Sequence, residues 1–146
     1  MSLCIVANWK LNGSREFNQQ WALEFLKYFN GNNFLPIGIA PASLYIDHLK
    51  EILDDYGIKI GAQNIDVLET GARTGEISAS MIKDLGCEFS IIGHSERRIL
   101  FGETSQMICQ KLIQANNNSV IPILCIGESA EENQANNTFN VLEKQI

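Results

Sequence analysis

Three side chains with complementary chemistry stand just after apolar, β-branched segments of this sequence. Lys10 follows the run LCIVA, and His94 and Glu96 follow the run EFSII. They offer an amine, an imidazole and a carboxylate. Such a set suits an anionic substrate whose carbonyl group is polarised while a proton is transferred.

His94 lies between a predicted strand and a predicted short helix. Gly93 allows a tight turn after the strand, and Ser95 is a favourable N-cap residue for a helix over residues 96–98. The partial positive charge of a helix amino end disfavours an imidazolium. His94 is therefore expected to stay neutral and to donate a hydrogen bond to a developing oxyanion. A structural histidine bonded to the backbone explains the position equally well.

The neighbouring polar residues are also open to two interpretations each. Lys10 supplies a fixed positive charge for an anion, or it is a surface lysine whose stem covers apolar groups. Asn8 either orients Lys10 or binds the substrate. Glu96 fits a catalytic set, but it also fits the first turn of a helix, where the dipole favours a carboxylate.

Five short apolar runs, with helical patterns between them, would position these residues. The runs begin at residues 3, 35, 58, 88 and 120, and a separation of about 30 residues is typical of a βα unit. Trp21, Phe25 and Phe29 form one helical stripe, and further stripes cover residues 44–53 and 107–115. Strands that are apolar on both faces predict a parallel sheet covered by helices.

Two architectures fit this alternation, a doubly wound open sheet and a (β/α) barrel. In a barrel, the polar residues that follow the strands, such as Asn8, Gln63, Asn64 and His94, all face one mouth. In an open sheet, only those beside the switch point share a site. The first loop, NWKLNGS, lacks a glycine-rich phosphate-binding pattern, which disfavours nucleotide binding.

Charge and cysteine usage narrow the class of protein. The formal charge of −6, with 11 Lys and Arg residues, disfavours nucleic acid and an anionic membrane surface as partners. No apolar run resembles a signal peptide or a membrane span, so we expect a cytoplasmic protein. The four cysteines, Cys4, Cys87, Cys109 and Cys125, form no CxxC pair. We expect reduced thiols, buried at Cys4, Cys87 and Cys125, and neither a zinc site nor a disulfide framework.

The segment GARTGEIS, residues 71–78, predicts a long loop before a helix that begins near Ser78. Loops of this size on a domain are usually functional or mediate contacts, and a plain solvated loop is the alternative. A protruding loop here favours association with another chain.

The 146 residues predict one incomplete domain, 1–146. Five strands cannot close an eight-stranded barrel, for which about 250 residues is typical. The final segment, NTFNVLEKQI, ends inside a helical pattern. We therefore expect an α/β protein whose barrel is cut to five β/α units.

Five blocks of the sequence resemble one family closely, the triosephosphate isomerases. The blocks are ANWKLNGS from Ala7, GAQNID from Gly61, TGARTGEISASMIKDLG from Thr70, IIGHSERR from Ile91 with FGE after it, and PILCIGE from Pro122. They keep the family's order and spacing from near residue 5 to residue 128. The chain is similar to the amino-terminal portion of such an enzyme, through the fifth β/α unit.

The resemblance implies a TIM (β/α)8 barrel that interconverts dihydroxyacetone phosphate and glyceraldehyde 3-phosphate through an enediolate, in glycolysis and gluconeogenesis, without cofactor or metal. Asn8 and Lys10 would contact the substrate, and His94 would pass a proton between two substrate oxygens. Glu96 would position Lys10. The expectation for His94 is not independent of the resemblance, because this family is itself a standard example of a catalytic histidine kept neutral by a helix terminus.

The resemblance also implies a homodimer. The loop with Thr74, Gly75 and Glu76 would reach into the partner subunit, and Thr74 would approach the partner's active site. Cys125 and Glu128 match supporting positions behind the mouth.

The sequence departs from the family in one large respect and two small ones. The family's general base is a glutamate after a sixth strand, and its phosphate-binding turns follow later strands; neither lies within these 146 residues. Because general-base catalysis contributes about 10²–10⁴-fold, we expect these residues alone to have little or no isomerase activity. Leu11 replaces a frequent Met. Arg73 replaces a common aromatic residue in the dimer loop, which affects dimer packing.

Two other functions are also compatible with the sequence. The first is a non-catalytic module that self-associates through uncovered strand edges. The second is an open-sheet binder of phosphate or nucleotide, which nucleotide but not phosphoglycolate would stabilise.

Overall fold

Five short parallel strands follow the five apolar runs of the sequence. The computed structural model describes residues 4–29 and 35–146, so the predicted start of the first run at Leu3 lies outside the described residues. The strands in these two ranges are β1 (Ile5–Asn8), β2 (Ile37–Ala40), β3 (Lys59–Ala62), β4 (Phe89–Ile92) and β5 (Ile121–Leu124).

Helices follow each of the five strands and confirm the predicted stripes. They are α1 (Arg15–Tyr28), α2 (Ile46–Leu53), α3 (Ala79–Asp84), α4 (Ser95–Leu100), α5 (Ser105–Asn117), α6 (Ala130–Gln134) and α7 (Thr138–Gln145), with short 3-10 turns at Ser43–Tyr45 and Asp54–Tyr56. Hydroxyl groups of Ser14, Ser78 and Thr104 accept a backbone N–H at the start of α1, α3 and α5. The sequence analysis missed α6, although its reciprocal capping box between Ser129 and Glu132 was visible in the sequence.

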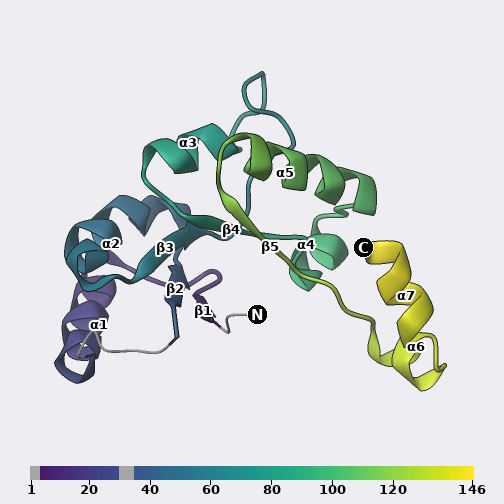
Figure 1. Ribbon diagram of the computed structural model, residues 1–146, viewed down its shortest axis with the longest axis horizontal. Helices are drawn as coiled ribbons and strands as arrows, with labels where there is room; N and C mark the ends of the chain where they lie inside the picture. Colours follow the sequence, from purple (N-terminus) through teal and green to yellow (C-terminus); the bar gives the residue numbers. More distant parts are fainter. Residues whose placement is uncertain (1–3, 30–34) are drawn as a thin grey trace.

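The order of the strands in the sheet selects a barrel over a doubly wound sheet. Each strand pairs in parallel with the next one along the chain, in the order β1-β2-β3-β4-β5. A doubly wound sheet would reverse its order at a switch point, which this sheet does not do. Figure 1 shows the sheet curling, with α1, α2, α3 and α5 along its outer side. The architecture is that of five β/α units of a TIM barrel.

Two apolar clusters fix the sheet. The larger cluster lies between the sheet and the outer helices and includes Ile39, Leu49, Ile82 and Ile92. The smaller one, around Phe89, includes Ala40 and Ile91. The ring of Phe89 crosses the glycines of neighbouring strands so closely that a Cβ on Gly61 would lie 2.5 Å from it. A glycine is therefore required beside this ring.

The cysteine prediction is partly wrong. All four cysteines are free, and Cys87 is buried, which raises the pKa of its thiol to about 11. Cys125 is half-buried, whereas Cys4 is exposed. Cys4 directly precedes β1, which is an edge strand of the sheet formed by the described residues.

No helix in the described ranges is long and apolar enough to span a bilayer.

Candidate active site

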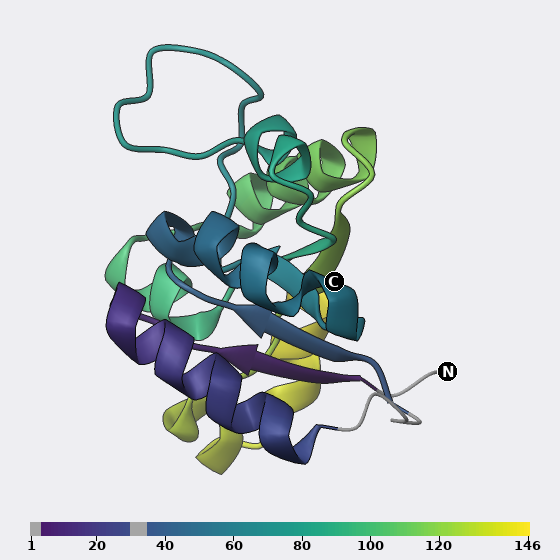
Figure 2. The ribbon, with the colours of Figure 1, turned by 90° about the vertical axis from the view of Figure 1, so that its left-hand side faces the viewer.

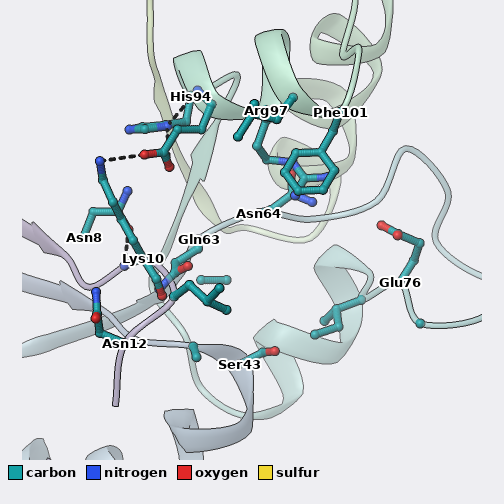
Figure 3. Close-up of a pocket in the computed structure, with 17 residues that line it drawn as sticks. Asn8, Lys10, Asn12, Ser43, Gln63, Asn64, Glu76, His94, Arg97 and Phe101 are labelled. Carbon is teal, nitrogen blue, oxygen red and sulfur yellow. Dashed lines mark hydrogen bonds and ion pairs between the residues drawn. The ribbon is translucent and has the colours of Figure 1, made fainter.

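The carboxyl ends of the first four strands open onto one cavity of about 650 Å³. Asn8 comes from the end of β1, Ser43 follows β2, Gln63 and Asn64 follow β3, and His94 follows β4. Figure 3 shows these side chains around the same space. The prediction that the strand ends share one mouth is confirmed for the first four strands, whereas Gly127 and Glu128, which follow β5, do not line this cavity.

Lys10 and Glu96 meet at this mouth. The Nζ atom of Lys10 donates to Oε1 of Glu96 at 2.7 Å, and the backbone N–H of Lys10 donates to Oδ1 of Asn8 at 3.0 Å. The bond from Lys10 lowers the pKa of Glu96. Both side chains of the ion pair are about half exposed, so it contributes little to stability and acts mainly by holding the ammonium group in place.

The backbone of Lys10 is held in an uncommon conformation. Its φ of 53° lies in the left-handed region, which side chains other than glycine seldom adopt. The Nε2 atom of Gln63 donates to the carbonyl oxygens of Lys10 and Ala40, each at 2.9 Å. Gln63 thereby ties the Lys10 turn to the end of β2. The sequence analysis placed Gln63 at a strand end but did not identify this contact.

His94 lies at the amino end of α4, as predicted, but the predicted cap was one residue too late. His94 itself is the N-cap residue, and Ser95 is the first residue of the helix. The Nδ1 atom of His94 accepts the backbone N–H of Glu96 at 3.3 Å. A short polar side chain is the usual N-cap, but here the imidazole accepts the free backbone N–H. Because a ring nitrogen that accepts carries no proton, the ring's donor is Nε2–H.

A second contact of the same nitrogen competes with this cap. Nδ1 of His94 lies 3.5 Å from Oε2 of Glu96, which would be an ion pair only with a protonated ring. The N-cap bond is the shorter of the two contacts and needs no charge on the ring. In this arrangement Glu96 serves Lys10 and His94 keeps a free donor.

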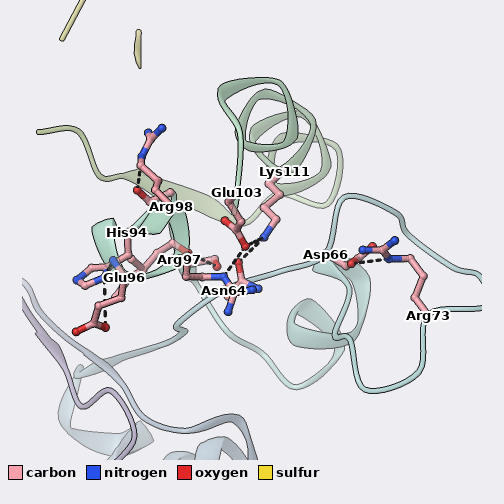
Figure 4. A network of polar contacts seen from close by, with 12 residues as sticks. Asn64, Asp66, Arg73, His94, Glu96, Arg97, Arg98, Glu103 and Lys111 are labelled. Carbon is pink, nitrogen blue, oxygen red and sulfur yellow. Dashed lines mark hydrogen bonds and ion pairs between the residues drawn. The ribbon is translucent and has the colours of Figure 1, made fainter. Parts of the chain in front are cut away.

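A buried network of charges supports the far side of the mouth (Figure 4). Oε1 of Glu103 accepts from Nε of Arg97 and from Nζ of Lys111, and Nζ of Lys111 also donates to Oδ1 of Asn64 at 2.7 Å. Glu103 and Lys111 are nearly inaccessible to solvent, and burial lowers the pKa of Lys111. The network ties Asn64, which lines the cavity, to α5.

The sequence analysis missed this network. A lysine on the apolar stripe of residues 107–115 was the available signal, because a buried lysine requires a partner.

Comparison with known proteins decides the family. A family model described as triosephosphate isomerase matches residues 3–146. The chain belongs to the triosephosphate isomerase family. The triosephosphate isomerase of Nitrosococcus oceani is 40% identical over 142 residues, which are 97% of this chain and 57% of that protein. That of Ruthia magnifica is 42% identical over 144 residues, 99% of this chain and 58% of that protein. The chain thus spans little more than half the length of these relatives.

The loop that the triosephosphate isomerase resemblance assigned to dimer contact stands away from the rest of the chain (Figure 2). Thr74 is exposed in it, whereas Gly75 and Glu76 line the cavity of their own chain. Arg73 folds back, so that its Nε donates to Oδ2 of the buried Asp66 at 2.8 Å. In this member of the family, the ion pair between Arg73 and Asp66 closes the loop at its base.

We expect this closure to depend on pH. Burial acts to raise the pKa of Asp66, but bonds from the Leu68 N–H and from Arg73 outweigh it, so the pKa lies below the ordinary 3.8. A depressed folded-state pKa stabilises the fold above the ordinary value, and this stabilisation is lost as the pH falls through the folded-state value. In a carbon-13 NMR titration, Arg73→Gln should move the Asp66 pKa upward. An unchanged titration curve would show that Arg73 does not hold the carboxylate.

Cys125 and Glu128, the two residues expected behind the mouth, make different contacts. Arg98 donates from Nε to the carbonyl of Gly93 at 2.8 Å and from Nη2 to that of Cys125 at 3.1 Å, which joins the ends of β4 and β5. Glu128 is outside the cavity lining and accepts side-chain bonds from Asn133 of α6 and Thr138 of α7, so it holds these two helices to the segment after β5.

A metal site is not indicated by side-chain grouping. Within residues 4–29 and 35–146, no three His, Cys, Asp or Glu side chains come together in a way that could hold a metal ion.

Proposed function

We propose that this chain supplies the cation, the hydrogen-bond donor and the substrate-binding asparagine of a triosephosphate isomerase active site. The observation that carries the proposal is the group of Lys10, Glu96 and His94 around one cavity in a member of this family. The proposed reaction interconverts dihydroxyacetone phosphate and glyceraldehyde 3-phosphate through an enediolate, in glycolysis and gluconeogenesis.

The geometry supports a distinct role for each residue. The ammonium group of Lys10 is aimed by Glu96 and attracts the anionic substrate, and its charge also stabilises the negative charge that develops on the enediolate. The Nε2–H donor of His94 polarises the carbonyl and then passes its proton between the two substrate oxygens. Asn8, which is bonded to the Lys10 backbone, would present its remaining amide donors to the substrate.

The proposal concerns the natural-length protein. In the resemblance, the base that removes the first proton follows a sixth strand, and the described part of this chain forms a sheet of five strands. We propose a homodimer contact through the loop with Thr74, Gly75 and Glu76, supported by the projection of this loop from the fold. A single domain over 1–146, a cytoplasmic location and a reaction without cofactor remain predictions of the sequence.

Binding of 2-phosphoglycolate, a stable anion with the charge pattern of the enediolate, tests the proposal. Trp9 adjoins Lys10, and Trp9 and Trp21 are the two tryptophans of the chain, so intrinsic fluorescence should report binding. We expect saturable binding that Lys10→Met weakens, together with isomerase activity in the natural-length protein. Binding of ATP in place of 2-phosphoglycolate, with no isomerase activity, would favour the nucleotide-binding alternative.

A further inference from the structure

The segment that carries Lys10 rests on α1 at both of its ends. Before Lys10, the ring of Trp9 packs edge-to-face against Trp21, with centroids 4.9 Å apart and planes at 79°, and against Phe17 at 5.9 Å. After Lys10, the amide of Asn18 packs under Gly13, where a Cβ would lie 2.9 Å from Oδ1 of Asn18.

Trp21 is the end of an aromatic stack along α1. Its ring stacks on Phe25 at 5.0 Å, and Phe25 stacks on Phe29 at 5.2 Å. Aromatic pairs of this kind add attraction beyond the area that they bury, and their preferred geometries fix the orientation of each ring. The stack therefore gives Trp9 a defined surface to rest on.

Burial of the Asn18 side chain carries a desolvation cost. The side chain is fully buried, and among residues 4–29 and 35–146 neither its Oδ1 nor its Nδ2 has a hydrogen-bond partner. An apolar side chain there would avoid the desolvation of two polar groups. Its contribution is thus not explained by stability, and what it visibly provides is direct contact with Gly13.

Lys10 needs such support because its own conformation is strained. A non-glycine residue at φ 53° persists only where the surrounding structure holds it. The contacts within the turn, from Asn8 and Gln63, hold the backbone of Lys10 itself. Trp21 and Asn18, three residues apart and so on one face of α1, hold the residues on either side of it.

We propose that Trp21 and Asn18 are positioning residues that clamp the segment 9–13 and so aim the Nζ atom of Lys10 at Glu96. The inference rests on the proposed function only in its claim about catalysis. Its claim about geometry stands on the contacts of α1 with Trp9 and Gly13.

The test compares Trp21→Leu with Phe25→Leu in the natural-length protein. Both variants remove one ring from the same stack, but of these two rings it is Trp21 that packs against Trp9, whereas Phe25 packs against Trp21. NMR titration of the Glu96 carboxyl reads the ion pair directly, since the bond from Lys10 lowers that pKa. We expect Trp21→Leu to move the Glu96 pKa upward. Trp21→Phe should keep most of the lowering seen in the parent, and Phe25→Leu should leave the Glu96 pKa unchanged.

Kinetics give the second measurement. Because Lys10 is proposed to attract the anionic substrate, a misplaced Nζ should weaken substrate binding. We therefore expect Trp21→Leu to reduce kcat/KM about tenfold, mainly through KM, with Phe25→Leu within about twofold of the parent. Asn18→Ala, which removes the contact with Gly13 along with the unpartnered amide, should shift the Glu96 pKa upward with little change in Tm.

The outcomes separate the two proposals. If Trp21→Leu and Phe25→Leu change the Glu96 titration equally, or if neither does, the positioning inference is overturned. If Trp21→Leu alone changes the titration while the parent protein has no isomerase activity, the positioning inference holds and the proposed function fails.

Discussion

Replacement of His94 by glutamine should lower kcat of the natural-length protein by about 10²–10⁴-fold, the usual contribution of a positioned acid–base group. Glutamine can still donate a hydrogen bond to a substrate oxygen, but it cannot take up and return a proton. The expected loss therefore lies in kcat rather than in KM, because we propose that Lys10 and Asn8, not His94, provide most of the substrate binding. Steady-state kinetics with glyceraldehyde 3-phosphate measure both parameters.

The chain offers a matched control for this substitution. His48 is the other histidine; it lies on α2 and outside the cavity lining. We expect His48→Gln to leave kcat within about twofold of the parent, because His48 does not line the cavity. Equal losses in the two variants, or near-normal turnover in His94→Gln, would remove His94 from the mechanism.

The position of His94 illustrates what the sequence can and cannot predict. The apolar run EFSII and the polar residues after it were sufficient to place His94 between a strand and a helix, because strand and helix patterns are local. The cap itself was assigned to Ser95, and the structure gives it to His94. Cap choice depends on which side chain reaches the free N–H, and this geometry shifts by a residue without changing the pattern.

Contacts between distant residues were harder to predict than elements. Gln63 and Lys10 are 53 residues apart, and Lys111 and Asn64 are 47 residues apart. Their meeting depends on the order of strands in the sheet, which a single sequence fixes only when a fold is assumed. The pairing of Lys10 with Glu96 followed from the family resemblance, whereas the Glu103 network has no local signature beyond a lysine in an apolar stripe.

That network makes the second large prediction, which concerns stability. Lys111→Met removes one of the two cations on Oε1 of Glu103 and leaves a buried carboxylate held by Arg97 alone. Breaking a buried ion pair by removing one partner typically costs about 3–5 kcal/mol. We expect a loss of about 3 kcal/mol in the free energy of unfolding, the lower end of this range, because Arg97 still pairs with Glu103. Urea unfolding followed by circular dichroism measures the change.

Lys59→Met is the control that isolates burial as the cause. Lys59 pairs with Glu88 at 2.6 Å, but both side chains are more than 40% exposed, at 47% and 41%, whereas those of Lys111 and Glu103 are 3% and 2% exposed. An exposed pair contributes about 0–1 kcal/mol, so Lys59→Met should have a small effect. The difference between the two variants in the free energy of unfolding then measures the effect of burial on a Lys–Glu pair.

The double variant Lys111→Met, Glu103→Gln distinguishes a stranded charge from lost packing. If the damage comes from the uncompensated Glu103 carboxylate, neutralising that carboxylate should recover part of the stability, since one partner's charge no longer lies buried without the other. If the double variant is as unstable as the sum of the two single variants, the loss belongs to packing around α5 instead. Asn64 loses its bond from Lys111 in both the single Lys111→Met variant and the double variant. Both variants therefore also remove the contact that ties this cavity-lining residue to α5.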